Sequence, residues 1–270
     1  MDALQLKLPR TIWKNRHLIA QLSKRKIEER YRGSILGWSW SFATPLLMLA
    51  VYTFVFSEVF QARWGDLDDS GPIGFAMNLF AGLIIFNVFS EVANQSPDLI
   101  PNNSNLVTKV VFPLPILSAV TVCAALFHAS TSLAILVLFE LISGHGIPGT
   151  ILALPLVWLP GIAGFLSLSW VLSALGVFLR DLGQVMGVCT NLLMFLSAVF
   201  YPLSALPEQW LPLLKLNPLV VLIEQTRLTC IEGQLPGTSY VIGGLLFTTA
   251  CCEIAFRAFQ KASKGFADVL

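Results

Sequence analysis

Long runs of apolar residues, separated by short polar stretches, dominate the chain between residues 38 and 258. A helix that crosses a membrane needs about 20 consecutive, mainly apolar residues. Six runs meet this requirement, at residues 38–60, 73–93, 116–141, 151–178, 184–203 and 239–258. The pattern therefore predicts an all-α integral membrane protein whose transmembrane domain, residues 38–258, contains six transmembrane helices.

Two segments outside these runs are also partly apolar. Residues 9–32, within an amino-terminal segment at 1–37, interleave basic and apolar residues, as amphipathic helices on membrane surfaces do. The apolar residues of this pattern are Leu8, Ile12, Leu18, Ile19, Leu22 and Ile27. Residues 204–238 hold two apolar pieces too short to span, and such pieces dip into a membrane with their backbone buried by protein. We therefore expect an amphipathic interface helix, outer re-entrant helices, and a short tail at 259–270.

The basic residues orient the chain in the membrane. If the amino terminus lies inside the cell, 14 of the 17 Lys and Arg residues face the cytoplasm, nine of them within the first 37 residues. Only Arg63, Lys215 and Arg227 then face outward. Because cytoplasmic loops carry an excess of Lys and Arg, both termini are predicted to be cytoplasmic. Residues 94–113 are then the longest inner loop between spans, and residues 204–238 form an outer loop.

Composition supports this class of protein. Apolar residues make up 55% of the chain and charged residues 12%, against about 45–50% and 25% in average soluble domains. A soluble domain with this composition would expose large apolar patches and aggregate. The basic amino-terminal segment could bind nucleic acid, but beside hydrophobic spans it indicates a cytoplasmic membrane face. We therefore expect no nucleic-acid partner.

Motifs for catalysis and nucleotide binding are missing. The sequence lacks G-x-x-x-x-G-K-[ST], so it has no loop that cradles nucleotide phosphates in that manner. It also lacks G-x-S-x-G and H-E-x-x-H. The five cysteines contain no C-x-x-C, and the three histidines lie far apart in sequence. We therefore expect no catalytic residue, no metal site and no cofactor in this chain.

Ionisable residues inside a membrane are functional candidates. Glu58, Glu91, Glu140 and Glu253 all fall near the ends of predicted spans, where partly hydrated carboxylates are expected. A proton-coupled transporter would instead place carboxylates near the midplane of the membrane. His128 alone lies mid-span, and we interpret it as a hydrogen-bonded side chain in the bundle interior rather than a pore-lining one.

Aromatic residues form stripes on the first two predicted spans. The residues that share one helical face of the first span are Trp38, Phe42, Tyr52, Phe56 and Phe60. The residues in a similar arrangement on the second span are Phe75, Phe86 and Phe89. Such stripes are typical of interfacial belts and helix packing. Alternatively they line a pore for a sugar polymer, because the C–H faces of sugar rings are attracted to aromatic faces.

Four stretches carry a resemblance to a known family. Residues 29–40, ERYRGSILGWSW, lead into Pro45-Leu46-Leu47 and resemble the start of the ABC-2 type permeases that export bacterial polysaccharides. The other three stretches that look like segments of this family are Asn105–Pro113 (NLVTKVVFP), Phe178–Leu182 (FLRDL), and Tyr201-Pro202 with Asn217-Pro218-Leu219. The family includes O-antigen, capsular polysaccharide and teichoic acid transporters, and no residue here decides among them.

The resemblance implies an architecture and partners. It implies a type V exporter-like ABC-2 fold, a homodimer of six-span subunits, and two copies of a separate ATPase that bind ATP and Mg²⁺. It also implies a bacterial inner-membrane location and, as substrate, a glycan built on an undecaprenyl-pyrophosphate lipid. General likeness favours an O-antigen permease. The missing nucleotide motif agrees with this division of labour.

The resemblance also suggests roles for residues at three places. In the inner loop, with Pro97 and Pro101 bracketing a short stiff helix, the ATPase-coupling candidates are Pro97, Asp98, Pro101, Asn105 and Lys109. In the outer loop, where Glu224 and Arg227 form an exposed pair, the gate candidates are Trp210, Glu224 and Arg227. On the basic segment, the candidate ligands of the incoming lipid pyrophosphate are Arg30 and Arg32. The alternative for both arginines is plain binding to anionic lipid headgroups.

Three other functions stay open at this point. A membrane enzyme acting on a lipid-linked sugar would need paired carboxylates, or a His and Arg cluster, at one interface, and the acids here are scattered. A scaffold subunit would leave the aromatic stripes and short outer pieces without a role. A small-molecule or lipid exporter of the same superfamily would have a narrower pore with fewer aromatic residues.

Overall fold

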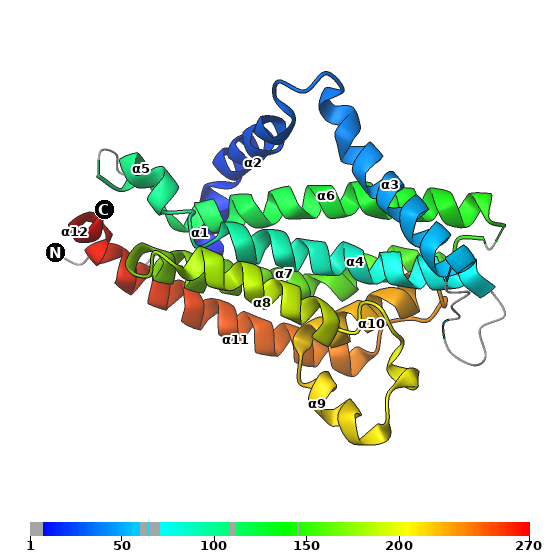
Figure 1. The fold of residues 1–270 in the computed structure, drawn as a ribbon. Helices are drawn as coiled ribbons and strands as arrows, with labels where there is room; N and C mark the ends of the chain where they lie inside the picture. The colour runs from blue at the N-terminus through cyan, green and yellow to red at the C-terminus, as the bar shows by residue number, and fades with distance from the viewer. Residues whose placement is uncertain (1–7, 60–63, 65–70, 109–111, 145) are drawn as a thin grey trace.

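The described part of the chain is helical throughout. The computed structural model describes residues 8–59, 64, 71–108, 112–144 and 146–270, and within them every regular element is a helix (Figure 1). Four long helices form the body of the molecule: α4 (Gly71–Gln95), α6 (Pro115–Ile142), α7 (Leu154–Phe178) and α11 (Thr238–Ala262). The 3-10 helix η4 (Gly149–Ala153) leads into α7, and η7 (Ser263–Gly265) and α12 (Phe266–Val269) follow α11.

These four helices confirm four of the six predicted spans. Each has at least 25 residues, which at about 1.5 Å per residue exceeds the roughly 30 Å hydrocarbon core of a bilayer. They correspond to the apolar runs predicted at 73–93, 116–141, 151–178 and 239–258. Among the described residues, four helices rather than six are therefore long and apolar enough to cross a membrane alone.

The α-helices in the first and fifth predicted spans are shorter than those spans. The first is divided into η1 (Gly37–Ser39), α3 (Trp40–Phe54) and the π-helix η2 (Val55–Val59). The fifth is α8 (Leu182–Leu196), whose 15 residues extend only about 22 Å. The chain leaves the helix where Ala198 adopts a left-handed backbone with φ of 52°. A run predicted to reach residue 203 therefore ends seven residues earlier.

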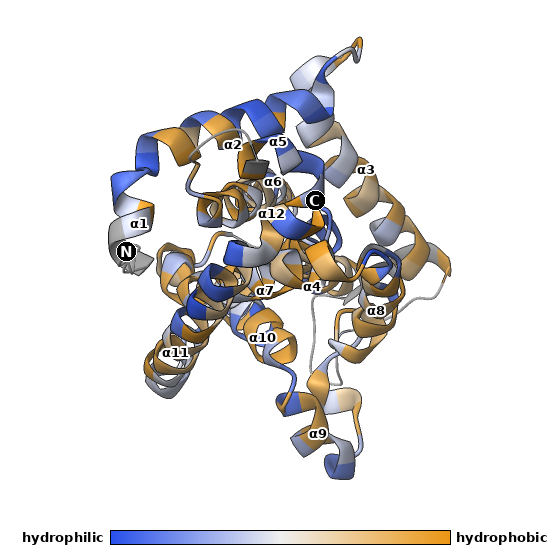
Figure 2. Cartoon of the chain, turned by 90° about the vertical axis from the view of Figure 1, so that its left-hand side faces the viewer, coloured by the Kyte–Doolittle hydropathy of each residue, from blue (hydrophilic) through white to orange (hydrophobic). Residues whose placement is uncertain are grey.

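Helix α4 occupies the centre of the bundle. Within its most apolar stretch, 83% of the residues are buried, against 17% in the corresponding stretch of α11. It contacts α3, α6, α7, α8 and α10, whereas α11 packs mainly along α7. Seen end-on, the helices around α4 and α7 are largely hydrophobic in sequence (Figure 2). Most of α4 therefore lies in the interior of the protein.

The amino-terminal segment forms two helices, α1 (Leu8–Lys14) and α2 (Arg16–Tyr31). Ile19, Ser23 and Ile27 recur at every fourth position and are buried. Ile19 packs with Ile116 and Val120 of α6, and the remaining surface of α2 is strongly hydrophilic (Figure 2). The apolar face of this segment thus covers the bundle itself, rather than facing only a membrane.

The segment predicted as an outer loop folds into four short helices: η5 (Leu203–Ala205), η6 (Glu208–Trp210), α9 (Leu211–Lys215) and α10 (Pro218–Cys230). Helix α9 projects from the bundle (Figure 1), whereas α10 is buried against α4 and α7. The carboxyl terminus lies at the opposite end of the bundle, near the helices η3 (Pro101–Asn103) and α5 (Ser104–Thr108) (Figure 1).

Candidate functional site

A polar cluster joins α2 to the helix bundle. Nη1 of Arg30 lies 3.2 Å from Oε2 of Glu91 on α4, and Nδ1 of His128 on α6 lies 3.0 Å from the same oxygen. Nη1 of Arg30 also lies 3.0 Å from His128 Nδ1. A ring nitrogen cannot both accept a hydrogen bond from Arg30 and donate one to Glu91. The tautomer of His128 therefore determines which of the two bonds Nδ1 makes. Gln95 Nε2 donates to Glu91 Oε1 at 3.2 Å.

Lys26 lies one turn before Arg30 and makes a second polar contact with α6. Its Nζ donates to Thr121 Oγ1 at 2.8 Å. Burial lowers the pKa of Lys26 to about 8, and the nearby carboxylates of Glu91 and Glu29 oppose this shift. Lys26 and Arg30 therefore attach the inner face of α2 to the bundle.

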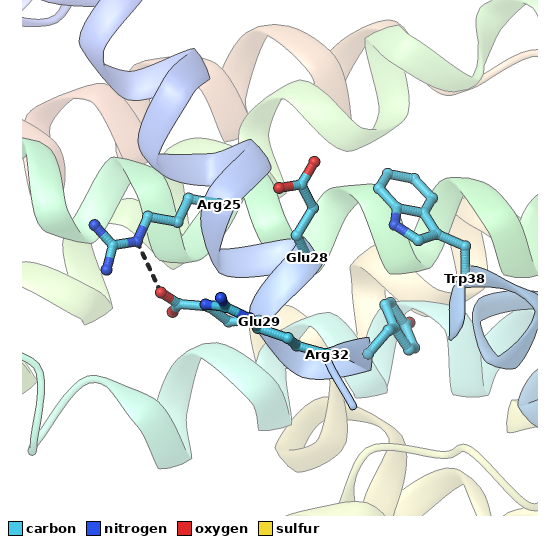
Figure 3. Close-up of a pocket in the computed structure, with 6 residues that line it drawn as sticks. Arg25, Glu28, Glu29, Arg32 and Trp38 are labelled. Carbon is cyan, nitrogen blue, oxygen red and sulfur yellow. Dashed lines mark hydrogen bonds and ion pairs between the residues drawn. The ribbon is translucent and has the colours of Figure 1, made fainter. Parts of the chain in front are cut away.

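A pocket of about 440 Å³ lies where α2 ends and α3 begins, and we call it the α2–α3 pocket (Figure 3). Its lining residues are Arg25, Glu28, Glu29, Tyr31, Arg32 and Trp38. Arg25 Nε donates to Glu29 Oε1 at 2.8 Å, a short ion pair. Glu28 is held more loosely, with Lys24 Nζ 3.8 Å from its Oε1. The exposed guanidinium of Arg32 makes no hydrogen bond or ion pair with other described residues.

Two glycines shape this pocket. Gly33 has φ of 83° and Gly37 has φ of 49°, values that L side chains rarely adopt. The chain therefore reverses direction tightly after Tyr31 and returns Trp38 beside the end of α2. The Trp38 ring is 47% exposed and makes an edge contact with Phe127 of α6, with 5.7 Å between ring centroids. This contact fixes an aromatic wall opposite the charged end of the helix.

The predicted aromatic stripes divide between surface and core. Trp38 and Phe42 are exposed, whereas Tyr52 and Phe56 are half-buried. The stripe members in the hydrophobic core of the single chain are Phe75, Phe86 and Phe89. Phe56 stacks on Phe75 at 4.8 Å between centroids. In this conformation the second-span aromatics contribute to helix packing, and Phe60 lies outside the described residues.

The inner-loop candidates lie at the end of the bundle that holds the carboxyl terminus (Figure 1). Residues 96–100 form turns, and the short helices begin at Pro101, so the expected helix between Pro97 and Pro101 is not present. Gly176 of α7 leaves room for the carbonyl of Pro97, because a Cβ there would overlap it. Asn105 is exposed on α5. Lys109 lies outside the described residues.

The start of this loop contacts α7 through a pair of serines, and Asp98 lies near α8. The carboxylate of Asp98 lies beside Gly183 at the start of α8. The Ser96 hydroxyl donates to Ser169 Oγ on α7 at 2.8 Å, in a fully buried position. The inner loop is therefore hydrogen-bonded to α7 through Ser96, and Asp98 lies close to the start of α8.

The structure corrects one prediction about the outer gate candidates, the exposure of Arg227. Trp210 is exposed and Glu224 is partly exposed, but Arg227 is only 1% exposed, so an exposed Glu224–Arg227 pair was wrong. The Arg227 guanidinium donates from Nε to the carbonyl of Asn78, from Nη1 to that of Ala198 and from Nη2 to that of Val199, at 2.8–2.9 Å. Its Glu224 contact is a long one of 3.8 Å.

The sequence-based prediction missed the burial of Arg227 because it used the number of charged residues in the outer loop. It did not consider which face of the helix carries Arg227. Arg227 lies four residues after Ile223 and three before Cys230, on the buried side of α10. That spacing was the available signal. Its guanidinium also lies 4.4 Å from the ring centroid of Trp64, a cation–π contact.

Two further ionisable residues can now be placed. His128 is hydrogen-bonded, as predicted, but it is partly buried at the contact of α2 with α4 and α6 rather than in the bundle interior. Glu140 was expected to be partly hydrated, but it is 1% exposed and its carboxylate has no hydrogen-bond partner among the described residues. The bundle packs more closely around the end of α6 than a span-end position suggests.

These features define a polytopic helical membrane protein with the basic helices α1 and α2 on one flank. The model of the ABC-2 type transporter family matches residues 17–230, and the chain belongs to this family. It is 27% identical to the O-antigen export system permease protein RfbA of Myxococcus xanthus, over 97% of this chain and 99% of that protein. It is 24% identical to RfbA of Klebsiella pneumoniae, over 94% and 95% of the two chains. It is also 24% identical to the polysialic acid transport protein KpsM of Escherichia coli, over 81% of each.

Membership of this family gives the chain a role in transport. It is a multi-pass inner-membrane permease subunit of an ABC transporter and not an enzyme. Membership also implies a partner ATPase subunit, since the sequence lacks a phosphate-binding loop.

Proposed function

We propose that this chain is the membrane-spanning subunit of an ATP-driven exporter for a polysaccharide linked to undecaprenyl pyrophosphate. The substrate is an O-antigen, and the exporter moves it across the bacterial inner membrane. The observation that carries the proposal is the match to an O-antigen permease over 97% of this chain and 99% of the relative. The match therefore extends over nearly the full length of both sequences.

The proposed topology keeps six spans, with α3 and α8 as the first and fifth. Helices η5, η6, α9 and α10 form the re-entrant outer region and cap the pore, and both termini are cytoplasmic. The carboxyl terminus lies near α5, at the end opposite the short outer helices, and this supports the orientation (Figure 1). Two copies of the chain form a homodimer, and the apolar surface of α3, including Phe42, Leu47 and Phe54, is exposed for contact with lipid or a second copy.

Two copies of the ATPase, which bind ATP and Mg²⁺, dock on the inner loop of the permease dimer. The exposed Asn105, the hydrogen bond of Ser96 to α7 and the position of Asp98 beside α8 support a coupling role for this loop. When ATP draws the ATPases together, the loop is pushed and α4, α7 and α8 tilt with it.

The lipid pyrophosphate approaches the bundle at the end of α2. Arg32 supplies the main contact, since its exposed guanidinium has no partner among the described residues and can bind phosphate oxygens in a bidentate manner. Arg30 adds positive charge two residues earlier, although Glu91 already holds part of its hydrogen-bonding capacity.

A complementation assay in a strain that lacks the chain tests this proposal. Wild-type chain is expected to restore surface polysaccharide, and Arg32→Glu is expected to abolish export while undecaprenyl-linked glycan accumulates inside. Arg16→Glu makes the same charge change at an exposed site on the other end of α2 and should export normally. Normal export by the Arg32→Glu variant would rule out the pyrophosphate site, and export of a lipid without glycan would reassign the substrate.

A further inference from the structure

The α2–α3 pocket brings together residues that the sequence assigned to different tasks. Arg32 was a candidate for the lipid pyrophosphate, and Trp38 was a candidate for stacking on sugars. In the structure both line one pocket, together with the carboxylate of Glu28 (Figure 3). This juxtaposition depends on the turn at Gly33 and Gly37, which returns the chain against the end of α2.

The three side chains offer three different kinds of contact. Arg32 presents planar N–H donors that suit phosphate oxygens. Glu28 is an acceptor for hydroxyl groups, and its contact with Lys24 is loose enough, at 3.8 Å, to leave its oxygens available. The half-exposed ring of Trp38 presents an aromatic surface to the pocket. A sugar attached to a phosphate displays the matching groups: negative oxygens, ring hydroxyls and an apolar C–H face.

The size of the pocket suits a small ligand. Its volume of about 440 Å³ lies near the lower end of the roughly 300–1,000 Å³ found for small-molecule sites. That volume is enough for a sugar residue with its phosphate. The neighbouring Glu29 is occupied by Arg25 at 2.8 Å, which leaves Glu28 as the carboxylate able to take a new partner.

We infer that the α2–α3 pocket recognises the single sugar residue joined to the pyrophosphate, with Trp38 against the sugar ring and Glu28 on its hydroxyls. The inference rests on the proposed function, since Arg32 must hold the pyrophosphate for the sugar to reach Trp38. The permease then selects its substrate by the linkage sugar, and the repeating units beyond it can vary without loss of recognition.

Equilibrium binding to the purified permease–ATPase complex tests the inference with two labelled probes. One is farnesyl pyrophosphate, and the other is the same lipid carrying one N-acetylglucosamine or one galactose on its pyrophosphate. At least one sugar-bearing probe is expected to bind wild type on the order of tenfold more tightly than the bare pyrophosphate, from one ring contact and one charged hydrogen bond. Trp38→Ala and Glu28→Gln should remove this advantage, and Trp38→Phe should keep most of it.

Matched variants separate the pocket from general effects. Trp13→Ala removes an exposed ring on α1, and Lys24→Gln removes the ion pair of Glu28 without removing its carboxylate. Both should keep the sugar advantage. If sugar adds no affinity to wild type, or its advantage survives in Trp38→Ala and Glu28→Gln, the inference is overturned while Arg32-dependent binding of the bare probe preserves the pyrophosphate site. If neither probe binds, or Arg32→Gln binds both as well as wild type, the pyrophosphate site fails and the inference fails with it.

Discussion

The guanidinium of Arg227 fills the space that a side chain at Gly82 would occupy. A Cβ at Gly82 would lie 2.5 Å from Arg227 Nη2, closer than two such atoms can approach. Gly82 is four residues after Asn78, whose carbonyl accepts a hydrogen bond from Arg227 Nε. The missing side chain on α4 therefore allows an arginine of α10 to reach the backbone of α4 and the two carbonyls beyond the end of α8.

Gly82→Ala is expected to destabilise the protein. The new methyl group displaces the guanidinium from up to three carbonyls, and overpacking of a closely packed interior costs about 1–3 kcal/mol. The measurement is the midpoint of thermal unfolding in detergent. Gly243→Ala is the control, because nothing lies within 4 Å of a Cβ at that helical position, and alanine there should leave the midpoint unchanged or raise it. Equal midpoints for Gly82→Ala and wild type would contradict the close contact.

Arg227→Lys should also destabilise the protein, although it keeps the charge. A single ammonium group cannot reach three carbonyls in the directions that the planar guanidinium covers. Loss of a hydrogen bond to a charged group corresponds to about 1.5–3 kcal/mol. Arg257→Lys is the matched control, since Arg257 is exposed and contacts only Glu253 among described residues. A shift no larger than that of Arg257→Lys would show that the buried arginine does not fix the outer region.

The contact between Arg30 and Glu91 should be measurable as a coupling energy. Because the Arg30 side chain is 54% exposed, solvent screening limits the expected coupling to about 0.5–1 kcal/mol. A double-mutant cycle with Arg30→Gln, Glu91→Gln and the combined variant, measured by thermal unfolding, isolates this term. The same cycle for the exposed Arg25–Glu29 pair provides a comparison within one helix. Strict additivity of the Arg30 and Glu91 effects would mean that the cluster does not attach α2 to the bundle.

The lowered pKa of Lys26 predicts that the free energy of unfolding rises at alkaline pH. Its pKa is lowered to about 8 in the folded protein from 10.5, chiefly by burial. Between these values the unfolded chain binds more protons at this site than the folded chain, so stability increases with pH across that window. Lys26→Met should remove this component, which is checked by comparing unfolding at pH 7.5 and 10 in both proteins. An unchanged pH slope in the variant would contradict the burial of the ammonium group.

Sequence patterns predicted the long helices because their apolar runs are local properties. The end of α8 was not predictable in this way, since the carbonyls of Ala198 and Val199 are satisfied by Arg227, 28 or 29 residues further along. The burial of Arg227, by contrast, had a local signal in its spacing from Ile223 and Cys230. Periodicity found the stripe that contains Phe75, but whether a stripe faces a pore or a neighbouring helix depends on packing partners that a single sequence does not specify.

The candidate site was partly predictable. The sequence singled out Arg30, Arg32 and Trp38, yet it treated Arg30 and Arg32 as equivalent. The structure separates them, because Arg30 contacts Glu91 and His128, which lie 61 and 98 residues away along the chain. The pocket that joins Arg32 to Trp38 arises from the backbone conformations of two glycines, which carried no chemical signal in the sequence.

Purification of the tagged chain from its native membrane in mild detergent tests the central claim most directly. We expect an ATPase with a phosphate-binding loop to co-elute in a one-to-one ratio with the permease. Elution without any ATPase, together with activity on a lipid-linked sugar, would contradict the assignment as an exporter subunit and favour a membrane enzyme.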